Sequence, residues 1–236
     1  MSIDLTNRTA LVTEATSGFG RATAKALAAA GAHVVLSGRD TERGNRIVAE
    51  IAAAGGKADF VAGALGDADS ARNLAAQACE LGGGHVDILV NNAGIFMLGP
   101  TEPVQESDFD AMLGINVKVP YVLVAELAPK MVEHGGGAIV NVSAMVAENG
   151  MPDMALHGAS KAALELLTKA WTAEFGLLGV RVNAVAPGPN RPEGTALLGV
   201  VPDQLASTAP AGRTASAQEI ADAVANLASD AGRVAV

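Results

Sequence analysis

The sequence predicts an α/β fold in which helices cover both faces of a doubly wound parallel sheet. Short runs of β-branched residues alternate with Ala- and Leu-rich stretches of ten or more residues, a rhythm that is typical of βαβ crossovers. Half of the 236 residues are apolar and only 3% are aromatic, so small aliphatic side chains must build the core. Neither a linker nor a repeat interrupts the rhythm, and we therefore expect one domain over residues 1–236.

Each expected strand is a short apolar run, and each expected helix is a longer stretch rich in good helix formers. In chain order, the runs TALVT, HVVLS, ADFVA, ILVN, AIVNVS and RVNAVA place strands at residues 9–13, 33–37, 58–62, 88–91, 138–143 and 181–186. The stretches between them place helices at residues 21–30, 41–54, 70–80, 107–133 and 160–175. Glycine clusters at 82–84 and 135–137 stand where the third and fourth helices should end.

Composition and charge exclude several classes of function. The formal net charge of −9 argues against nucleic acid or an anionic membrane as partner. The start MSIDLTNRTALV lacks the pattern of a signal peptide, and no uninterrupted apolar run approaches the length of a membrane span. Cys79 is the only cysteine, so no internal disulfide can form, and it is expected to be a small core residue. The histidines at 33, 85 and 134 have no spacing typical of metal ligands, so we expect no metal site. Taken with the preceding observations, the sequence leads us to expect a cytoplasmic protein.

A glycine-containing turn follows the first strand and opens the first helix. It reads Thr13-Glu14-Ala15-Thr16-Ser17-Gly18-Phe19-Gly20. Such a turn can hold a dinucleotide pyrophosphate on backbone N–H groups and the helix dipole, although a tight turn without a ligand gives the same pattern. Within it we expect cofactor contacts from Thr13, Ser17, Gly18, Phe19 and Gly20.

The end of the second strand bears on the choice of nucleotide. The strand ends Ser37-Gly38-Arg39, so no carboxylate stands at Gly38 to accept a hydrogen bond from a ribose 2′-hydroxyl. Arg39 is placed to meet a 2′-phosphate, which favours NADP(H). The alternative is that Arg39 is a solvated cation at the start of a helix.

Further motifs follow at the ends of the later strands. They are Asn91-Asn92-Ala93-Gly94, Gly114-Ile115-Asn116-Val117, Asn141-Val142-Ser143-Ala144, the pair His157 and Lys161, and Asn183-Ala184-Val185-Ala186-Pro187-Gly188. In this order, and over about residues 7–230, the chain resembles the short-chain dehydrogenase/reductase family, whose mark is Tyr-x-x-x-Lys.

This resemblance implies a Rossmann-like fold and an NADP(H) cofactor. Beyond the first turn and Arg39, the cofactor contacts that it implies are Asn91, Ala93, Gly94, Lys161, Pro187 and Gly188. It also implies catalytic roles for Lys161 and for Asn116, the latter as the anchor of a proton-relay water.

Two catalytic positions depart from the family pattern. His157 stands where the family has its proton-donating tyrosine, and Ala144 stands where it has the serine that holds the substrate oxygen. Ser143 lies one residue too early, and adjacent strand residues point to opposite faces. We therefore expect that Ser143 does not replace the missing serine.

The cofactor site departs from the pattern too. Glu14 replaces a glycine and brings bulk and a like charge toward a pyrophosphate. Ala64 stands where the family has an aspartate that accepts from adenine, and Asp67 is expected to be a helix N-cap. These changes predict weak nicotinamide nucleotide binding. The chain also stops before the last strand of most relatives, so a terminal strand is expected to be largely missing.

His157 allows two interpretations. An imidazole can give or take a proton near neutral pH, and Lys161 one turn along the helix should lower its pKa, which makes it a plausible base. Alternatively, it fills the cleft without doing chemistry. The expected catalytic residues are Asn116, His157 and Lys161.

Three functions follow from these departures. The favoured one is a repurposed enzyme that performs non-redox acid/base chemistry, such as elimination, isomerisation or cyclisation, on a small apolar or carbonyl-bearing molecule. The second is an NADP(H)-dependent carbonyl or alcohol oxidoreductase in which His157 replaces the tyrosine. The third is a catalytically silent binding or partner subunit.

Two further expectations concern loops and assembly. The loop before His157 contains three methionines, at 145, 151 and 154, which suggest an adaptable apolar wall. Residues 190–201 are either a lid over the ligand or a surface loop. The long helices at 107–133 and 157–175 carry wide apolar faces, through which relatives commonly pair, and the missing terminal strand removes a second contact, so we expect a homodimer.

Overall fold

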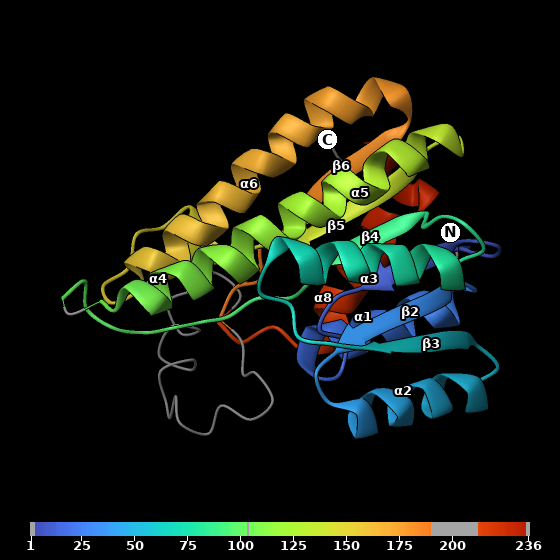
Figure 1. Cartoon of the computed structure of the whole chain (residues 1–236), viewed down its shortest axis with the longest axis horizontal. Helices are drawn as coiled ribbons and strands as arrows, with labels where there is room; N and C mark the ends of the chain where they lie inside the picture. The colour runs from blue at the N-terminus through green and yellow to red at the C-terminus, as the bar shows by residue number, and fades with distance from the viewer. Residues whose placement is uncertain (1–2, 103, 190–211, 235–236) are drawn as a thin grey trace.

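The computed structural model describes residues 3–102, 104–189 and 212–234. Its centre is a six-stranded sheet in the order β3-β2-β1-β4-β5-β6 (Figure 1). The strands are β1 (Thr9–Val12), β2 (His33–Gly38), β3 (Lys57–Ala62), β4 (Ile88–Asn91), β5 (Gly137–Val142) and β6 (Val180–Val185). Every adjacent pair is parallel. The predicted α/β parallel sheet is confirmed.

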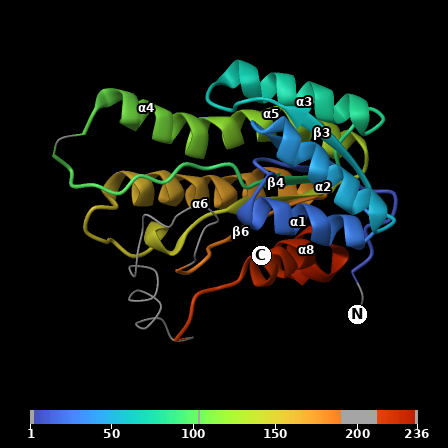
Figure 2. The same ribbon diagram turned by 90° about the horizontal axis from the view of Figure 1, so that it is seen from below.

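Helices cover both faces of this sheet (Figure 2). They are α1 (Gly18–Ala29), α2 (Thr41–Ala53), α3 (Ala68–Leu81), α4 (Glu106–Leu113), α5 (Val119–Glu133), α6 (Ala155–Phe175) and α8 (Ala217–Ala228). Alternation along β1 divides the core, because Leu11 packs with α3, α5 and α6 whereas Ala10 and Val12 pack with α1, α2 and α8. Cys79 lies buried in the first of these two clusters, as expected.

The structure refines two helix predictions and adds a helix that the sequence pattern did not predict. The long helix is interrupted between α4 and α5 by a π-helical turn, η1 (Gly114–Lys118), which a hydrophobic period cannot indicate. Helix α6 begins at Ala155, so His157 lies in its first turn. Helix α8 was not predicted, although Ser216 and Glu219 form a capping box whose Ser-x-x-Glu pattern is visible in the sequence. The expected N-cap role of Asp67 at α3 is confirmed.

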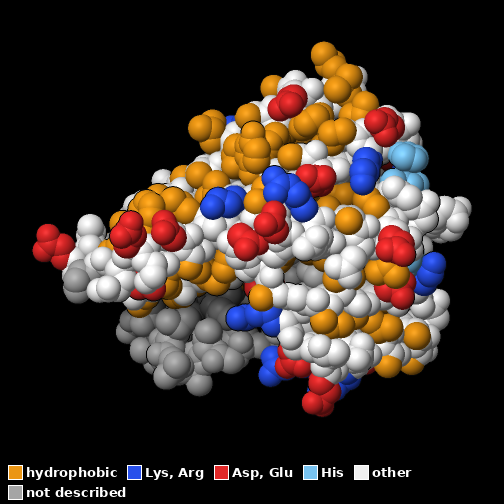
Figure 3. All heavy atoms as spheres, in the orientation of Figure 1, with side chains coloured by type: hydrophobic (Ala, Val, Ile, Leu, Met, Phe, Trp, Pro, Cys, Tyr) orange, Lys and Arg blue, Asp and Glu red, His pale blue; other side chains and the backbone are white. Residues whose placement is uncertain are grey.

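One helix in the described part of the chain, Glu106–Glu133, is long and apolar enough to cross a membrane. Half of its most apolar window is buried inside the fold, which is also how a core helix of a globular domain looks. On the face drawn in Figure 3, apolar side chains gather over α5 and α6. Exposed large side chains on these helices include Tyr121 and Leu166.

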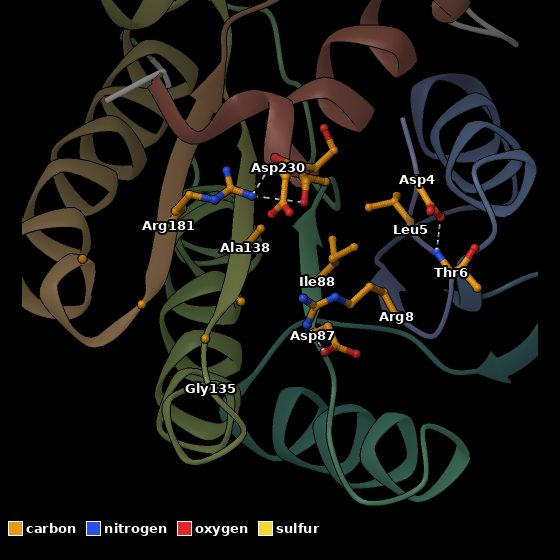
Figure 4. A pocket seen from close by; sticks show the side chains of 16 residues that line it. Asp4, Leu5, Thr6, Arg8, Asp87, Ile88, Gly135, Ala138, Arg181 and Asp230 are labelled. Carbon is orange, nitrogen blue, oxygen red and sulfur yellow. Dashed lines mark hydrogen bonds and ion pairs between the residues drawn. The ribbon is translucent and has the colours of Figure 1, made fainter. Parts of the chain in front are cut away.

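A pocket of about 590 Å³ opens at the edge of the sheet where the strands begin (Figure 4). The charged groups of its wall are engaged with one another or with the backbone. Arg8 pairs with Asp87 at 2.9 Å, and Arg181 donates to the carbonyls of Leu227, Ala228 and Ser229. The predicted site residues lie instead where the strands end.

Candidate active site

The turn between β1 and α1 contains two glycines with different roles. Gly18 has φ +52°, and a Cβ added there would meet nothing within 4 Å, so the space above the turn is open. Gly20 is needed for packing, because a Cβ there would lie 2.5 Å from the Glu14 carbonyl oxygen and 2.6 Å from Asn92 Nδ2. The turn therefore holds the start of α1 tightly against β4 and leaves its outer surface free.

The first N–H groups of α1 receive no side-chain cap. Ser17 is the N-cap residue but makes no capping hydrogen bond, and the first turn carries no acidic residue. Helices α2, α3 and α8 are capped by Asp40, Asp67 and Ser216, whereas α4 and α6, like α1, have no side-chain cap. Uncapped N–H groups and the helix dipole favour an anion, so this end of the site fits a nucleotide phosphate. Phe19 packs against the core beneath α1.

The end of β2 has no room for a side chain at Gly38. A Cβ there would lie 2.6 Å from Thr16 Cγ2, so the packing of the turn leaves no space for a carboxylate side chain at this position. Arg39 follows and is exposed, as is Ala64 after β3. A contact between Arg39 and a 2′-phosphate stays a prediction.

Two of the expected cofactor residues tie the strand ends together. The Thr13 hydroxyl donates to the Val90 carbonyl (3.2 Å) and accepts from the backbone N–H groups of Asn92 (2.9 Å) and Ala93 (2.8 Å). Asn91 Nδ2 donates to Asn141 Oδ1 at 2.8 Å. These side chains therefore hold β1, β4 and β5 in register, and the expected cofactor contacts of Thr13 and Asn91 stay predictions.

Lys161 is buried where β5 ends. Its Nζ donates to the Val142 carbonyl at 2.8 Å. A Cβ at Gly94 would lie 3.2 Å from this Nζ and 3.3 Å from Asn116 Oδ1, so glycine lets the lysine approach the β4 loop. Burial lowers the pKa of Lys161 to about 8, and the nearby Glu14 carboxylate acts in the opposite direction. The ammonium form still prevails at pH 7.

The Glu14 side chain is held against the β4 loop. With φ at +49°, its side chain turns from the phosphate turn toward the β4 loop, where Oε2 accepts from the Gly94 N–H at 3.4 Å. The carboxylate is close enough to Lys161 to raise the pKa of that amine. The structure thus places the carboxylate beside the Gly94 N–H, and the expected effect of Glu14 on pyrophosphate binding stays a prediction.

Asn116 is fully buried within the π-helical turn. Its Oδ1 accepts from the Ile95 N–H at 2.9 Å, and its Nδ2 lies within hydrogen-bond distance of the Ile95 carbonyl (3.1 Å) and the Ser160 hydroxyl (2.9 Å). It thus fixes the chain beyond Gly94 against α6. The water-anchoring role that the resemblance implies stays a prediction.

His157 is buried, with 8% of its surface exposed. Its ring meets the edge of Phe96 at a centroid distance of 5.1 Å, and Nδ1 has no hydrogen-bond partner among the described residues. Burial, and then the charge of Lys161, lower the pKa of His157 to about 4, although a hydrogen bond with the Ile95 backbone raises it. The imidazole is therefore neutral at pH 7.

The hydroxyl of Ser143 is engaged on the other side of the strand end. It donates to Glu165 Oε1 at 2.6 Å, whereas the half-buried Ala144 carries no polar group. Sequence reasoning did not single out Glu165, although its place four residues after Lys161 puts both on one face of α6. Phe96 was missed as well, because nothing in a loop sequence indicates which side chain will cover a neighbour.

The last predicted contacts lie near the loop after β6. The buried Pro187 accepts a hydrogen bond through its carbonyl from the Met145 N–H at 3.1 Å, which fixes the short helix η2 (Met145–Ala147). Gly188 follows and is half-buried. The lid or loop expected at residues 190–201 lies outside the described residues. Within the described ranges, no three His, Cys, Asp or Glu side chains gather as metal ligands.

Known proteins share this fold and sequence pattern. The model of the short chain dehydrogenase family matches residues 8–198. The 3-oxoacyl-[acyl-carrier-protein] reductase FabG of Rickettsia conorii is 35% identical over 97% of this chain and 92% of its own length. One solved structure, of a short chain dehydrogenase/reductase family protein, is 46% identical with a TM-score of 0.88, covering 98% of this chain and 94% of that one.

A second solved structure shows a related protein with its nucleotide. It is described as an NAD(P)-dependent gluconate 5-dehydrogenase candidate from Beutenbergia cavernae with bound NADP at low occupancy. It is 37% identical with a TM-score of 0.92, and the match covers 99% of this chain and 94% of that chain. The order of motifs, the sheet and these matches agree, and this chain belongs to the short-chain dehydrogenase family of oxidoreductases.

Proposed function

We propose that this chain uses the family scaffold for proton transfer on a small carbonyl-bearing molecule, without hydride transfer. The carrying observation is the placement of two groups in one site. His157 has a buried Nδ1 with no hydrogen-bond partner among the described residues, and Lys161, one turn along α6, has a buried Nζ. The imidazole is neutral and the amine mostly an ammonium ion at pH 7. A base and an acid held side by side are what proton abstraction next to a carbonyl requires.

The chemistry balances within the protein's own groups. His157 Nδ1 takes a proton from the carbon next to the carbonyl, and Lys161 gives a proton to the carbonyl oxygen, so that an enol forms. Return of the protons gives an isomerised or unchanged substrate. In elimination, the enol O–H returns its proton to Lys161, the carbonyl re-forms, and the bond to the β-substituent breaks as that group leaves with the proton held by His157. Phe96, which is 44% exposed, is the side chain that must turn aside for a substrate to reach Nδ1.

Solvent exchange tests this function directly. Small ketones and β-keto thioesters would be incubated with the protein in D₂O, and exchange of the α-hydrogens would be followed by NMR without any nucleotide. We expect exchange with the unaltered protein and its loss in His157→Phe and Lys161→Met. His134→Phe, at an exposed position, is the matched control. Exchange that persists in His157→Phe would overturn the assignment of the base.

The second candidate is NADP(H)-dependent carbonyl or alcohol oxidation and reduction. It is supported by the oxidoreductase relatives, by the NADP-bound neighbour and by the uncapped start of α1. In this function His157 would be the proton donor for reduction. A pKa of about 4 leaves few protonated imidazoles at neutral pH, so NADPH-dependent ketone reduction should then rise steeply from pH 7 toward pH 4. NADPH consumption with that pH profile would favour this candidate over the first.

A protein that shows neither exchange nor NADPH consumption would favour the third function, a silent binding or partner subunit. We further propose a cytoplasmic location, which a chain with one cysteine and no internal disulfide suits.

A further inference from the structure

Glu14 holds an unusual backbone position in this site. Its φ of +49° lies in the left-handed region, which is uncommon for a residue with a side chain. Such a conformation persists only where its surroundings fix it. Here the Glu14 carbonyl oxygen accepts from Asn92 Nδ2 at 3.2 Å, and the carboxylate accepts from the Gly94 N–H at 3.4 Å. Both ends of the residue are thus tied to the β4 loop.

The groups that Glu14 engages are ones that the family resemblance assigns to the cofactor. Gly94 and Lys161 belong to the reacting end of the site, since Lys161 lies beside His157, which takes the place of the proton donor. The carboxylate bonds to the first and acts electrostatically on the second. At this end, therefore, the residues as they stand do not fit the dinucleotide.

Among the described residues, nothing obstructs the opposite end of the site. A Cβ at Gly18 would meet nothing within 4 Å, the first N–H groups of α1 have no side-chain cap, and Arg39 is exposed. A ligand with an adenosine and phosphates can therefore approach the start of α1 without displacing the Glu14 carboxylate from Gly94. The α1 side and the Gly94 side of the site thus differ in what they can accept.

We propose that Glu14 is an internal competitor of the nicotinamide half of the dinucleotide, and that the site accepts adenosine phosphates on the α1 side without displacing it. A whole dinucleotide has to remove the carboxylate from Gly94 and from the neighbourhood of buried Lys161. The phosphates of both ligands carry the same sign of charge as Glu14, so charge alone does not separate them. The selective effect is the displacement of the carboxylate from Gly94 and Lys161, which only the dinucleotide requires. This inference is independent of the proposed proton transfer, because it concerns binding alone.

Calorimetric titration of two ligands against three proteins tests the proposal. The ligands are adenosine 2′,5′-bisphosphate and NADP⁺, and the proteins are the unaltered chain, Glu14→Gly and Glu14→Gln. The unaltered chain should bind the fragment at least as tightly as NADP⁺. Both variants should bind NADP⁺ about tenfold more tightly or better, the effect of a hydrogen bond to a charged group. Fragment affinity should change less than about twofold in both, within the scatter of such effects.

A variant that removes a glutamate charge elsewhere on the surface is the control for this titration. Glu80→Gln removes the same charge from an exposed position near the end of α3 and should leave both affinities unchanged. Equal gains for fragment and dinucleotide would mean that Glu14 acts only through general charge, and the proposal would be wrong. An unchanged NADP⁺ affinity in both variants, or no fragment binding by any of the proteins, would also overturn it. Thermal unfolding of each variant verifies that it is folded.

Discussion

At the residue scale, keeping His157 neutral in the folded protein lowers the free energy of unfolding at acidic pH. Its pKa is about 4 in the folded protein and close to 6.5 when the chain is unfolded. Between these values only the unfolded chain binds the proton, so the free energy of unfolding should fall as the pH drops from about 6.5 to about 4. Urea unfolding at pH 7 and pH 4.5 measures this slope. His157→Phe should flatten it and His134→Phe should not; equal slopes in all three would contradict the buried, neutral imidazole.

Glu14 leads to a second prediction at this scale. Because its carboxylate raises the pKa of Lys161, Glu14→Gln should lower that pKa below about 8. The rate at which Lys161 reacts with an amine-selective reagent, followed against pH by mass spectrometry, reports the change. Glu42→Gln should leave the titration in place. An unshifted titration in Glu14→Gln would mean that the two side chains do not interact in solution.

The same residues show which features of the site the sequence predicts and which it does not. The identities of His157, Ala144 and Glu14 at family positions follow from spacing, which also places them at the ends of parallel strands. The sequence could not tell that Glu14 would turn to Gly94, because a side-chain direction set by a positive φ is not encoded in a motif. Nor could it place Phe96 against His157, since loop side chains follow no period.

At the element scale, the predicted strands and helices agree with the structure within a few residues. The exceptions are places where contacts between distant segments of the chain set the local backbone conformation. The π-helical turn is such a place. A Cβ at Gly114 would lie 2.8 Å from the Gly66 carbonyl oxygen, so glycine lets this helix approach the loop after β3. Local propensity alone predicts a regular helix here. The contact with Gly66 and the bonds of Asn116 join segments far apart in the sequence.

Asn116→Ala tests what the π-helical turn holds in place. The substitution removes the bonds to both polar groups of the Ile95 backbone and to Ser160. It should lower the free energy of unfolding by about 2 kcal/mol, since each buried group left unpaired costs about 1–3 kcal/mol. Hydrogen exchange at the Ile95 N–H should accelerate. Asn73→Ala, at an exposed position on α3, should do neither, and unchanged exchange at Ile95 would refute the anchoring role.

At the scale of the whole molecule, the faces of α5 and α6 away from the sheet expose large apolar side chains. Tyr121 is 53% exposed and Leu166 is 68% exposed, while the Tyr121 ring lies 6.0 Å from that of Trp171, which joins the two helices in one apolar surface (Figure 3). Contiguous apolar patches of this kind mark protein interfaces. The pairing of this surface with its own copy requires no other molecule and gives a closed two-fold assembly.

We therefore propose that the chain forms a homodimer through α5 and α6. Light scattering coupled to size exclusion should give the mass of two chains. Leu166→Asp places a charge in the middle of the contact and should shift the protein to the mass of one chain at micromolar concentration, because an unpaired charge is costly to bury. Leu81→Asp introduces the same charge at the end of α3, another exposed apolar position, and should leave the dimer intact. A monomeric unaltered chain, or a Leu166→Asp variant that stays dimeric, would show that the apolar face has another use.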